Sequence, residues 1–236
     1  ALRFYNKAIE EGNEDAIILY RRAYCVEQVE NFDAAWGHYW EALDKLRDQN
    51  REHRYFGYAK GKILSKENSD SVNLLYSTDL ELWEEAEKYL KTAEDIDISY
   101  RNGWTPLLIA VDLSNTDFAK KLLGKGADPN ARARFENEER QDFTLYPLGL
   151  AAKKGISEII QPLIDAGAEI DKELEYEDEE GTALTFAIEY DHTDIASTLI
   201  ESGADPSLSE HNPLFTAIRK KNSEVSEKLL NFGGDP

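Results

Sequence analysis

Cysteine and methionine are almost absent from this sequence of 236 residues: Cys25 is the single cysteine, and there is no methionine. One thiol cannot form an intramolecular disulfide or a multi-thiolate zinc site, and it fits a reducing compartment, so we expect a cytoplasmic protein. We interpret Cys25 as a small packing residue on a helix. Because even the first position is not methionine, we expect the sequence to be a processed or trimmed form of a longer chain.

Long apolar runs and positive charges are also scarce. No apolar run approaches the roughly 18 residues that span a bilayer, and no signal peptide is visible, so we expect no membrane partner. The 27 Lys and Arg residues are outnumbered by 47 Asp and Glu residues, which gives a net charge of −20. Binding to nucleic-acid backbones depends on neutralising phosphates, so we expect no nucleic-acid partner. The acidity serves solubility, or it attracts a protein partner with a basic patch.

The short motifs of common enzyme chemistries are missing as well. The sequence has no G-x-G-x-x-G, no phosphate-binding Gly-Lys-Ser/Thr, no G-x-S-x-G and no H-E-x-x-H. Its four histidines, at positions 38, 53, 192 and 211, have no second histidine or cysteine at ligand spacing. We therefore expect no enzyme activity, no catalytic residues, no metal site and no cofactor.

Residues 101–236 instead contain a motif that recurs four times. Gly-Ala-Asp-Pro occurs at 126–129 and 203–206, and degenerate copies occur at 167–170 and 233–236. Each copy is preceded, about 20 residues upstream, by a start that resembles Thr-Pro-Leu. These starts are Thr105-Pro106-Leu107, Tyr146-Pro147-Leu148, Thr182-Ala183-Leu184 and Asn212-Pro213-Leu214. Proline presets φ in the first helical turn, and glycine supplies the left-handed residue that ends a helix.

This pattern resembles the ankyrin repeat, with repeats at about 101–131, 132–171, 172–207 and 208–236. The resemblance implies helix pairs joined by finger-like connections. The histidine that the family has after Pro-Leu is replaced in all four copies, which implies fewer hydrogen bonds between repeats. The replacements are Leu108, Gly149, Thr185 and Phe215. His192 occupies the turn between two helices, where we expect a structural role.

The spacing of the repeats is uneven. The alanines of successive inner helices are 41, 36 and 30 residues apart, whereas the regular repeat has a period of about 33. The first two fingers are therefore predicted to be extended and the last one to be shortened. We also expect Gly126 and Gly203 to have positive φ, because each follows a predicted helix.

The first hundred residues show another spacing: a small residue, an aromatic residue or leucine four positions later, and an alanine three positions after that. It occurs as Ala1-Tyr5-Ala8, Ala35-Tyr39-Ala42 and Ala86-Leu90-Ala93. Such spacings place three side chains on one helix face. The interval from Ala1 to Ala35 is 34 residues, and the pattern resembles the second helix of the tetratricopeptide repeat. A first helix is predicted to start near Ala16, with Leu19, Ala23 and Val26 at its packing positions.

The interval from Ala35 to Ala86 is longer than one such period, so we interpret residues at about 62–78 as an insert within a turn. The insert is either a surface excursion whose apolar half covers a groove or a partner-binding loop. Residues 94–103 contain no flexible linker. We therefore predict an all-α fold class, a continuous right-handed solenoid of helical hairpins with at least twelve helices and little strand. Its tetratricopeptide-like repeats (1–100) stack directly onto four ankyrin-like repeats (101–236).

Repeat solenoids recognise proteins on their concave surface, so candidate binding residues follow from the two resemblances. The groove of the first part is predicted to contain Tyr20, Tyr24, Arg54 and Tyr58, unless these tyrosines pack under the insert. In the ankyrin-like part, the candidates belong to the fingers and to the two residues that close each inner helix. They are Trp104, Lys153, Lys154, Glu177, Glu179, Glu180, Glu189, Tyr190, Arg219 and Lys220.

Two of these features have alternative interpretations. Trp104 is either an exposed binding hot spot or a side chain packed on the Tyr100 segment. The finger at 173–180 carries six acidic residues in eight, which form a solvated loop or hold a basic segment of a partner.

The function predicted from the sequence is that of a non-enzymatic scaffold or adaptor with a charge-complementary interface. Two alternatives stay open: a stoichiometric inhibitor of a basic toxin enzyme, such as a bacterial immunity protein or antitoxin, and a secreted effector that acts on host proteins.

Overall fold

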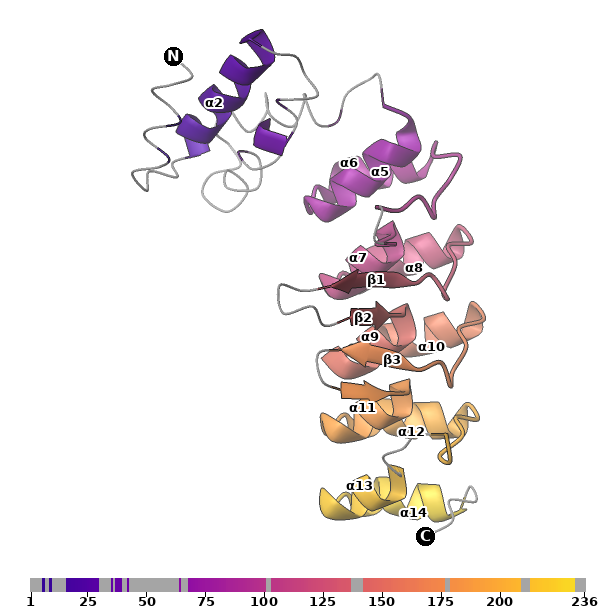
Figure 1. Cartoon of the computed structure of the whole chain (residues 1–236). Helices are drawn as coiled ribbons and strands as arrows, with labels where there is room; N and C mark the ends of the chain where they lie inside the picture. The colour runs from indigo at the N-terminus through magenta and orange to yellow at the C-terminus, as the bar shows by residue number, and fades with distance from the viewer. Residues whose placement is uncertain are drawn as a thin grey trace. The chain divides into compact units, whose positions relative to one another are not determined.

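Helices predominate in the computed structural model of the chain (Figure 1). The structure describes residues 6, 9, 16–29, 35, 37–39, 42, 64, 68–100, 103–136, 142–176, 179–208 and 213–231. The chain divides into two compact units, Ala1–Ala93 and Glu94–Pro236. Eleven helices lie in the described residues, so the expected total of at least twelve stays a prediction, as does continuous packing across 94–104. Within the same residues, no helix has the length and apolar character needed to cross a membrane.

The first described helix is α2 (Ala16–Val29), which begins where the sequence places the start of a repeat. Its Leu19, Ala23 and Val26 are buried, because spacings of three and four residues place them on one helix face. Arg54 and Tyr58, the other two candidates of the predicted groove besides Tyr20 and Tyr24, lie outside the described residues.

The small–aromatic–small pattern also falls on buried positions. Ala35, Tyr39 and Ala42 are fully buried, and the ring centroid of Tyr39 lies 5.6 Å from that of Tyr20 on α2. Small side chains on either side of an aromatic ring allow a second helix to approach closely. The burial agrees with helix-on-helix packing, while the tetratricopeptide-like character of this part stays a prediction.

Residues 70–79, most of which were interpreted as part of an insert, form the helix α5 (Asp70–Asp79). Ser69 caps this helix by accepting a hydrogen bond from the N–H of Val72 at 3.2 Å. Leu74 and Leu75 are buried, and α5 packs on α6 (Trp83–Leu90). This stretch is therefore the first helix of a hairpin and not a loop, while its interpretation as an insert stays a prediction.

The polar composition of α5 explains why the sequence pattern did not reveal a buried helix. Ser77 and Thr78 are fully buried. The hydroxyl of Ser77 donates to the carbonyl of Asn73 at 2.7 Å, and that of Thr78 donates to the carbonyl of Leu74 at 2.7 Å. Because these bonds lie within the helix itself, both hydroxyls are satisfied without water.

The second unit contains four helix pairs in its described residues. They are α7 (Pro106–Asp112) with α8 (Thr116–Gly124), α9 (Pro147–Lys154) with α10 (Ser157–Asp165), α11 (Ala183–Glu189) with α12 (Thr193–Glu201), and α13 (Pro213–Arg219) with α14 (Ser223–Asn231). Each inner helix (α7, α9, α11, α13) packs on the next inner helix, and each outer helix on the next outer helix (Figure 1). Each pair therefore buries its apolar side chains against its neighbours, as in repeat arrays.

The connections after α8 and α10 contain β-hairpins, which the all-α prediction did not include. The first hairpin is β1 (Ala133–Glu136) with β2 (Asp142–Leu145), and the second is β3 (Leu174–Tyr176) with β4 (Glu179–Gly181). Because β2 also pairs with β3, the hairpins form one antiparallel sheet in the order β1-β2-β3-β4. These are the two fingers predicted to be extended, and their length leaves enough residues for paired strands.

Residues in the left-handed region, with positive φ, occur at two kinds of position in the repeats. After the outer helices, Gly126, Gly167 and Gly203 have φ of 91°, 95° and 93°, so positive φ is confirmed for Gly126 and Gly203. In the turn between the two helices of each pair, the left-handed residues are Ser114 (56°), Gly155 (73°), Asp191 (61°) and Lys221 (60°). The residue after each of these donates its N–H to a carbonyl five residues earlier.

The α5–α6 hairpin has the same turn. Glu81 has φ 53°, and the N–H of Leu82 donates to the carbonyl of Ser77 at 2.8 Å. The corresponding distance in the α7–α8 turn, from the N–H of Asn115 to the carbonyl of Ala110, is also 2.8 Å. The hairpin in the first unit is thus built like the four pairs of the second unit.

The glycine at the end of α12 offers a test of backbone strain. We expect Gly203→Ala to lower the free energy of unfolding by about 1 kcal/mol, because an L-residue in the left-handed region is strained. No heavy atom lies within 4 Å of the added Cβ, so packing does not contribute. Gly124→Ala is the matched control: its Cβ also meets open space, but the site is helical, so alanine is expected to stabilise it. Equal urea midpoints for the two variants would contradict the capping role.

Candidate functional site

The residues that close the inner helices place six of the ten candidates of the second unit in one row. This row, which we call the inner-helix ladder, contains the last two residues before each left-handed turn. Its members are Asp112, Leu113, Lys153, Lys154, Glu189, Tyr190, Arg219 and Lys220. At each step, charged side chains of one repeat meet opposite charges of the next.

At the first step, Lys154 reaches back from α9 to the end of α7. Its Nζ donates to Oδ1 of Asp112 at 2.5 Å and also to the backbone carbonyl of Asp112. The carbonyl is one of those that the end of α7 leaves without an intrahelical donor. Lys154 therefore caps the preceding inner helix and forms an ion pair with it.

The second step ties a finger to two inner helices. Nζ of Lys153 donates to Oε2 of Glu179 on β4 and, at 2.8 Å, to the hydroxyl of Tyr190. That hydroxyl in turn donates to Oε2 of Glu179 at 2.8 Å. The ammonium group also lies 4.7 Å from the ring centroid of Tyr190 and 5.1 Å from that of Phe186. Hydrogen bonds and cation–π contacts thus surround a lysine side chain that is only 11% exposed.

This arrangement favours the charged forms of both partners. Burial acts to lower the pKa of Lys153, but the hydrogen bonds to Glu179 and Tyr190 outweigh it, so the pKa lies above its usual value. Burial acts to raise the pKa of Glu179, but the hydrogen bonds from Lys153 and Tyr190 outweigh it, so the pKa lies below its usual value. The pair therefore stays ionised over the whole neutral range.

The third step joins α11 to α13. Arg219 donates to Oε1 of Glu189, and Nζ of Lys220 donates to the carbonyl of Glu189 at 2.5 Å. Lys220 also lies 3.4 Å from Oδ2 of Asp191. All four basic candidates of the second unit thus have acidic partners within the chain, and their contact with another protein stays a prediction.

The remaining candidates are scattered. Tyr24 is 49% exposed, and Tyr20 is half-buried beside Tyr39. Trp104 is also half-buried, and its carbonyl accepts a hydrogen bond from the N–H of Tyr100 at 3.1 Å. Glu180 is exposed on β4, whereas Glu177 lies outside the described residues.

A second ladder, at the turns that follow the outer helices, was missed by the sequence reasoning. Oδ1 of Asp97 accepts the N–H of Asp128 at 2.9 Å, and Oδ1 of Asp171 accepts that of Asp205 at 2.9 Å. Between them, Asn130 accepts the N–H of Glu169 at 2.8 Å and donates to the carbonyl of Gly167 at 3.0 Å. The available signal was an Asn or Asp two positions after the acidic residue in two of the Gly-Ala-Asp-Pro-like motifs, namely Asn130 after Asp128 and Asp171 after Glu169.

His192 lies in the turn before α12, where the sequence placed it. Its Nε2 is 3.2 Å from the carbonyl of Lys153, and its ring stacks on that of Tyr190 with 6.5 Å between centroids. A Cβ on Gly155 would come within 2.5 Å of the imidazole ring. The contacts of His192 thus join neighbouring repeats. In the part of the chain that the structure describes, no three metal-ligating side chains gather.

Comparison with known proteins identifies ankyrin repeats in the second unit, while the boundaries of the single repeats stay a prediction. Residues 148–236 match the family model for ankyrin repeats in three copies, and residues 102–134 match that for the ankyrin repeat, which together is just over half of the chain.

Several curated proteins are similar. The ankyrin repeat and KH domain-containing protein mask-1 of Caenorhabditis elegans is 27% identical over 135 residues, which is 56% of this chain and 5% of that protein. The ankyrin repeat, SAM and basic leucine zipper domain-containing protein 1 of Neofelis nebulosa is 28% identical over 111 residues (47% and 22%). The ankyrin repeat and SOCS box protein 11 of Danio rerio is 36% identical over 91 residues (38% and 30%). The chain thus spans less than a third of each of these relatives.

The Lys153–Glu179 pair predicts a pH-dependent stability. The pKa of Glu179 is lower in the folded chain than its usual value of 4.5. Its contribution to the free energy of unfolding is therefore present above pH 4.5 and disappears as the pH falls through the pKa of the folded state. The pKa of Lys153 is raised, so its contribution is present below the usual 10.5 and disappears as pH rises through the folded value. Near pH 7 we expect Glu179→Gln to lower the free energy of unfolding by roughly 0.5–1 kcal/mol, because Glu179 is half-exposed.

The measurement is urea unfolding across pH, with Glu180→Gln as the matched control. Glu180 is the neighbouring exposed carboxylate on the same strand, so its replacement changes the net charge equally without touching the ladder. An equal loss of unfolding free energy in both variants would contradict the stabilising role of the Lys153–Glu179 pair. A loss in Glu179→Gln that persists unchanged at pH 2 would contradict it as well.

Proposed function

Because the chain belongs to the ankyrin repeat family over residues 102–134 and 148–236, we propose that it is a non-enzymatic protein-interaction module, a cytoplasmic scaffold or adaptor. Its partner binds on the concave surface formed by the inner-helix ladder and the fingers. The observation that supports this proposal most strongly is the inner-helix ladder itself. Its hydrogen bonds and ion pairs fix long side chains before any partner arrives, and such preorganisation lowers the entropic cost of binding.

Two side chains on the ladder have the exposure and character of binding anchors. Leu113 is 37% exposed and Tyr190 is 40% exposed, and both occupy the last position before the left-handed turn. Tyr190 is held by Lys153 and Glu179, so its ring is rigid as well as accessible. Aromatic side chains fixed in this way are typical hot spots of protein interfaces.

The charges favour a partner with a basic patch. Lys153, Lys154, Arg219 and Lys220 already have acidic partners in the chain, whereas Glu173 and Glu180 on the second finger are exposed. Added to the net charge of −20, these carboxylates make the finger the proposed contact for a basic segment, in preference to the lysines of the ladder.

A second candidate function is stoichiometric inhibition of a basic enzyme. The same acidic finger and the same net charge favour it, since an acidic protein can cover a basic active site. No residue of the chain specifically favours the secreted-effector alternative. For the first unit, the tetratricopeptide-like interpretation remains part of the proposal, supported by the burial of Leu19, Ala23 and Val26 on α2.

Charge reversal on the finger tests the proposal. A partner is isolated on the immobilised full chain, and its affinity is measured for the wild type and for the double variant Glu173→Lys/Glu180→Lys. We expect a loss on the order of tenfold, mainly through slower association, because the steering charge is removed. Raising salt to 0.5 M shortens the screening length to about 4 Å and is expected to slow association of the wild type in the same way.

The control for this experiment is Glu158→Lys/Glu224→Lys, which changes the net charge equally on the outer helices α10 and α14. We expect this control to bind with nearly the affinity of the wild type. Equal losses in both double variants, or salt-independent binding, would reject the finger as the contact.

A further inference from the structure

Two arginines at the start of β1 are exposed and have no acidic partner in the part of the chain that the structure describes. In this they differ from the basic residues of the inner-helix ladder. Exposure alternates along the segment: Ala131 and Ala133 are 8% and 0% exposed, whereas Arg132 and Arg134 are exposed. Because successive side chains of a strand point to opposite faces, both arginines lie on the face that is turned away from the core.

The register of the sheet explains why its own carboxylates do not neutralise Arg134. Arg134 lies opposite Thr144 on β2, and Thr144 lies opposite Glu175 on β3. Neighbouring strands are about 4.8 Å apart, so Glu175 is two strands, or roughly 10 Å, away from Arg134. An ion pair requires nitrogen and oxygen within about 4 Å. The charge of Arg134 is therefore available to a molecule outside the sheet.

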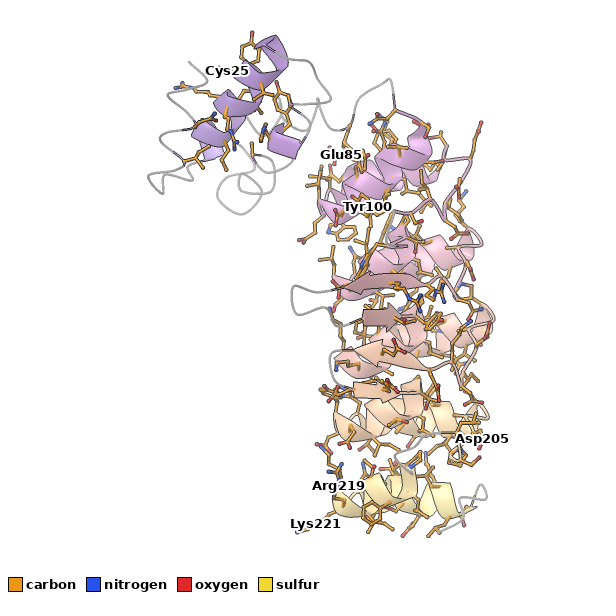
Figure 2. All side chains as sticks on the ribbon, viewed as in Figure 1. Cys25, Glu85, Tyr100, Asp205, Arg219 and Lys221 are labelled. Atoms are coloured by element: carbon orange, nitrogen blue, oxygen red, sulfur yellow. The ribbon has the colours of Figure 1, made fainter. Side chains whose placement is uncertain are left out.

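The strand that carries these charges is an outer strand, since the sheet has the order β1-β2-β3-β4 (Figure 1). The preceding finger is a tight turn, in which the N–H of Gly103 donates to the carbonyl of Tyr100 at 2.8 Å. Figure 2 labels Tyr100 in this turn, at the end of the sheet where β1 lies. The turn contacts the start of the β1 segment, because a Cβ on Gly103 would collide with the carbonyl oxygen of Arg132.

The alternation of hydrogen bonds across the sheet turns the backbone groups of Arg134 toward the outer edge. Tyr176 pairs with Glu179 at the end of the β3–β4 hairpin, where two residues connect them, so this pair is hydrogen-bonded. Hydrogen-bonded and non-hydrogen-bonded pairs alternate along antiparallel strands. The backbone groups of Glu175 therefore point to Thr144, and those of Arg134 point away from β2. No hydrogen bond from described residues outside the sheet reaches them.

The sequence of β1 complements itself when a second copy runs in the opposite direction. The strand reads Ala-Arg-Phe-Glu, so Arg134 and Glu136 stand one position before and one position after Phe135. In an antiparallel pair centred on Phe135, each Arg134 lies opposite Glu136 of the other copy, and Phe135 lies opposite its equivalent. Opposite charges and aromatic residues at directly opposed positions both stabilise a sheet.

This register also agrees with the direction of the backbone groups. A hydrogen-bonded pair requires that both residues turn their N–H and carbonyl to the shared edge. Arg134 does so, and Glu136, two positions later on the same strand, shares that direction. A pairing centred on Arg134 instead would place two arginines opposite each other, and like charges at opposed positions destabilise a sheet. The register centred on Phe135 is therefore favoured by charge and by hydrogen bonding together.

We propose that the outer edge of β1 pairs with β1 of a second copy of the chain, antiparallel and about a two-fold axis at Phe135. The sheets of the two copies then form one continuous sheet, in which each Arg134 pairs with Glu136 of the other copy. An isologous contact of this kind closes after two copies. Because only one short strand of each copy takes part, the dimer is weak and reversible. The contact lies on the first finger and is independent of the proposed contact of the second finger with a basic segment.

Sedimentation velocity of the full chain tests for the dimer. We expect a reversible dimer with a dissociation constant on the order of 10–100 μM. The measurement is made at about 0.15 M salt, where repulsion between the two acidic chains is screened beyond about 8 Å. A chain that stays monomeric at about 500 μM, well above this dissociation constant, overturns the proposal.

Charge exchange within β1 tests the register. Arg134→Glu and Glu136→Arg each place like charges opposite each other, so we expect each to weaken the dimer at least tenfold. The double variant Arg134→Glu/Glu136→Arg restores opposite charges and is expected to dimerise nearly as the wild type does. An equimolar mixture of the two single variants is likewise expected to form a mixed dimer. Failure of the double variant to recover overturns the register.

The matched controls for this experiment lie away from the sheet. Lys125→Glu, after α8, changes the net charge as Arg134→Glu does, and Glu158→Lys, on α10, changes it as Glu136→Arg does. Both controls are expected to dimerise like the wild type. Losses in the controls as large as those of the β1 variants would assign the effect to net charge and overturn the proposal.

A proline substitution tests the backbone contribution. The N–H of Arg134 points to the outer edge, so Arg134→Pro removes a donor from that edge and leaves the β1–β2 pairing intact. Arg134→Gln removes the same charge but keeps the N–H. We expect the proline variant to dimerise at least tenfold more weakly than the glutamine variant, while circular dichroism shows the same fold for both. Equal dimerisation of the two folded variants would overturn strand pairing as the mode of contact.

Discussion

Each helix pair of the second unit buries its apolar side chains only against its neighbours, and the other features described here depend on this constraint. It requires the positions facing the next repeat to be small or apolar, as Gly149 and Ala152 are. It places the finger of one repeat over the inner helix of the one before, so that Leu174 fills the space above Gly149.

Polar interactions repeat with the same period and specify which pair follows which. At the outer turns, an Asn or Asp side chain accepts the backbone N–H of the next turn, as Asp97, Asn130 and Asp171 do. The inner-helix ladder instead alternates in charge, so exchanging two neighbouring repeats would bring like charges together. Apolar burial supplies most of the free energy that holds neighbouring repeats together. The alternating charges specify the order of the repeats along the stack. Lys153 combines both roles, because its ammonium group lies against two aromatic rings.

Much of the second unit could be predicted from the sequence, because Gly-Ala-Asp-Pro and its Thr-Pro-Leu-like start mark the ends of helices chemically. The glycine conformations at Gly126 and Gly203 followed from the same motif. The fingers were predicted by length but not as strands, since strand pairing depends on a partner outside the motif. The ladder residues were placed on one surface, yet their pairing was not foreseen: Lys154 and Asp112 are 42 positions apart. Helix α5 was missed because Ser77 and Thr78, polar in sequence, are satisfied inside the helix.

The turns between paired helices have a consequence for how this array can change in evolution. Four of the five described turns hold a non-glycine residue in the left-handed region: Glu81, Ser114, Asp191 and Lys221. Each of these conformations costs about 1 kcal/mol that glycine would avoid. Replacing one of these residues with glycine would therefore raise the stability of the array without changing its core. A lineage that changes its binding surface, and loses stability in doing so, can recover that loss at positions that leave the apolar interfaces untouched.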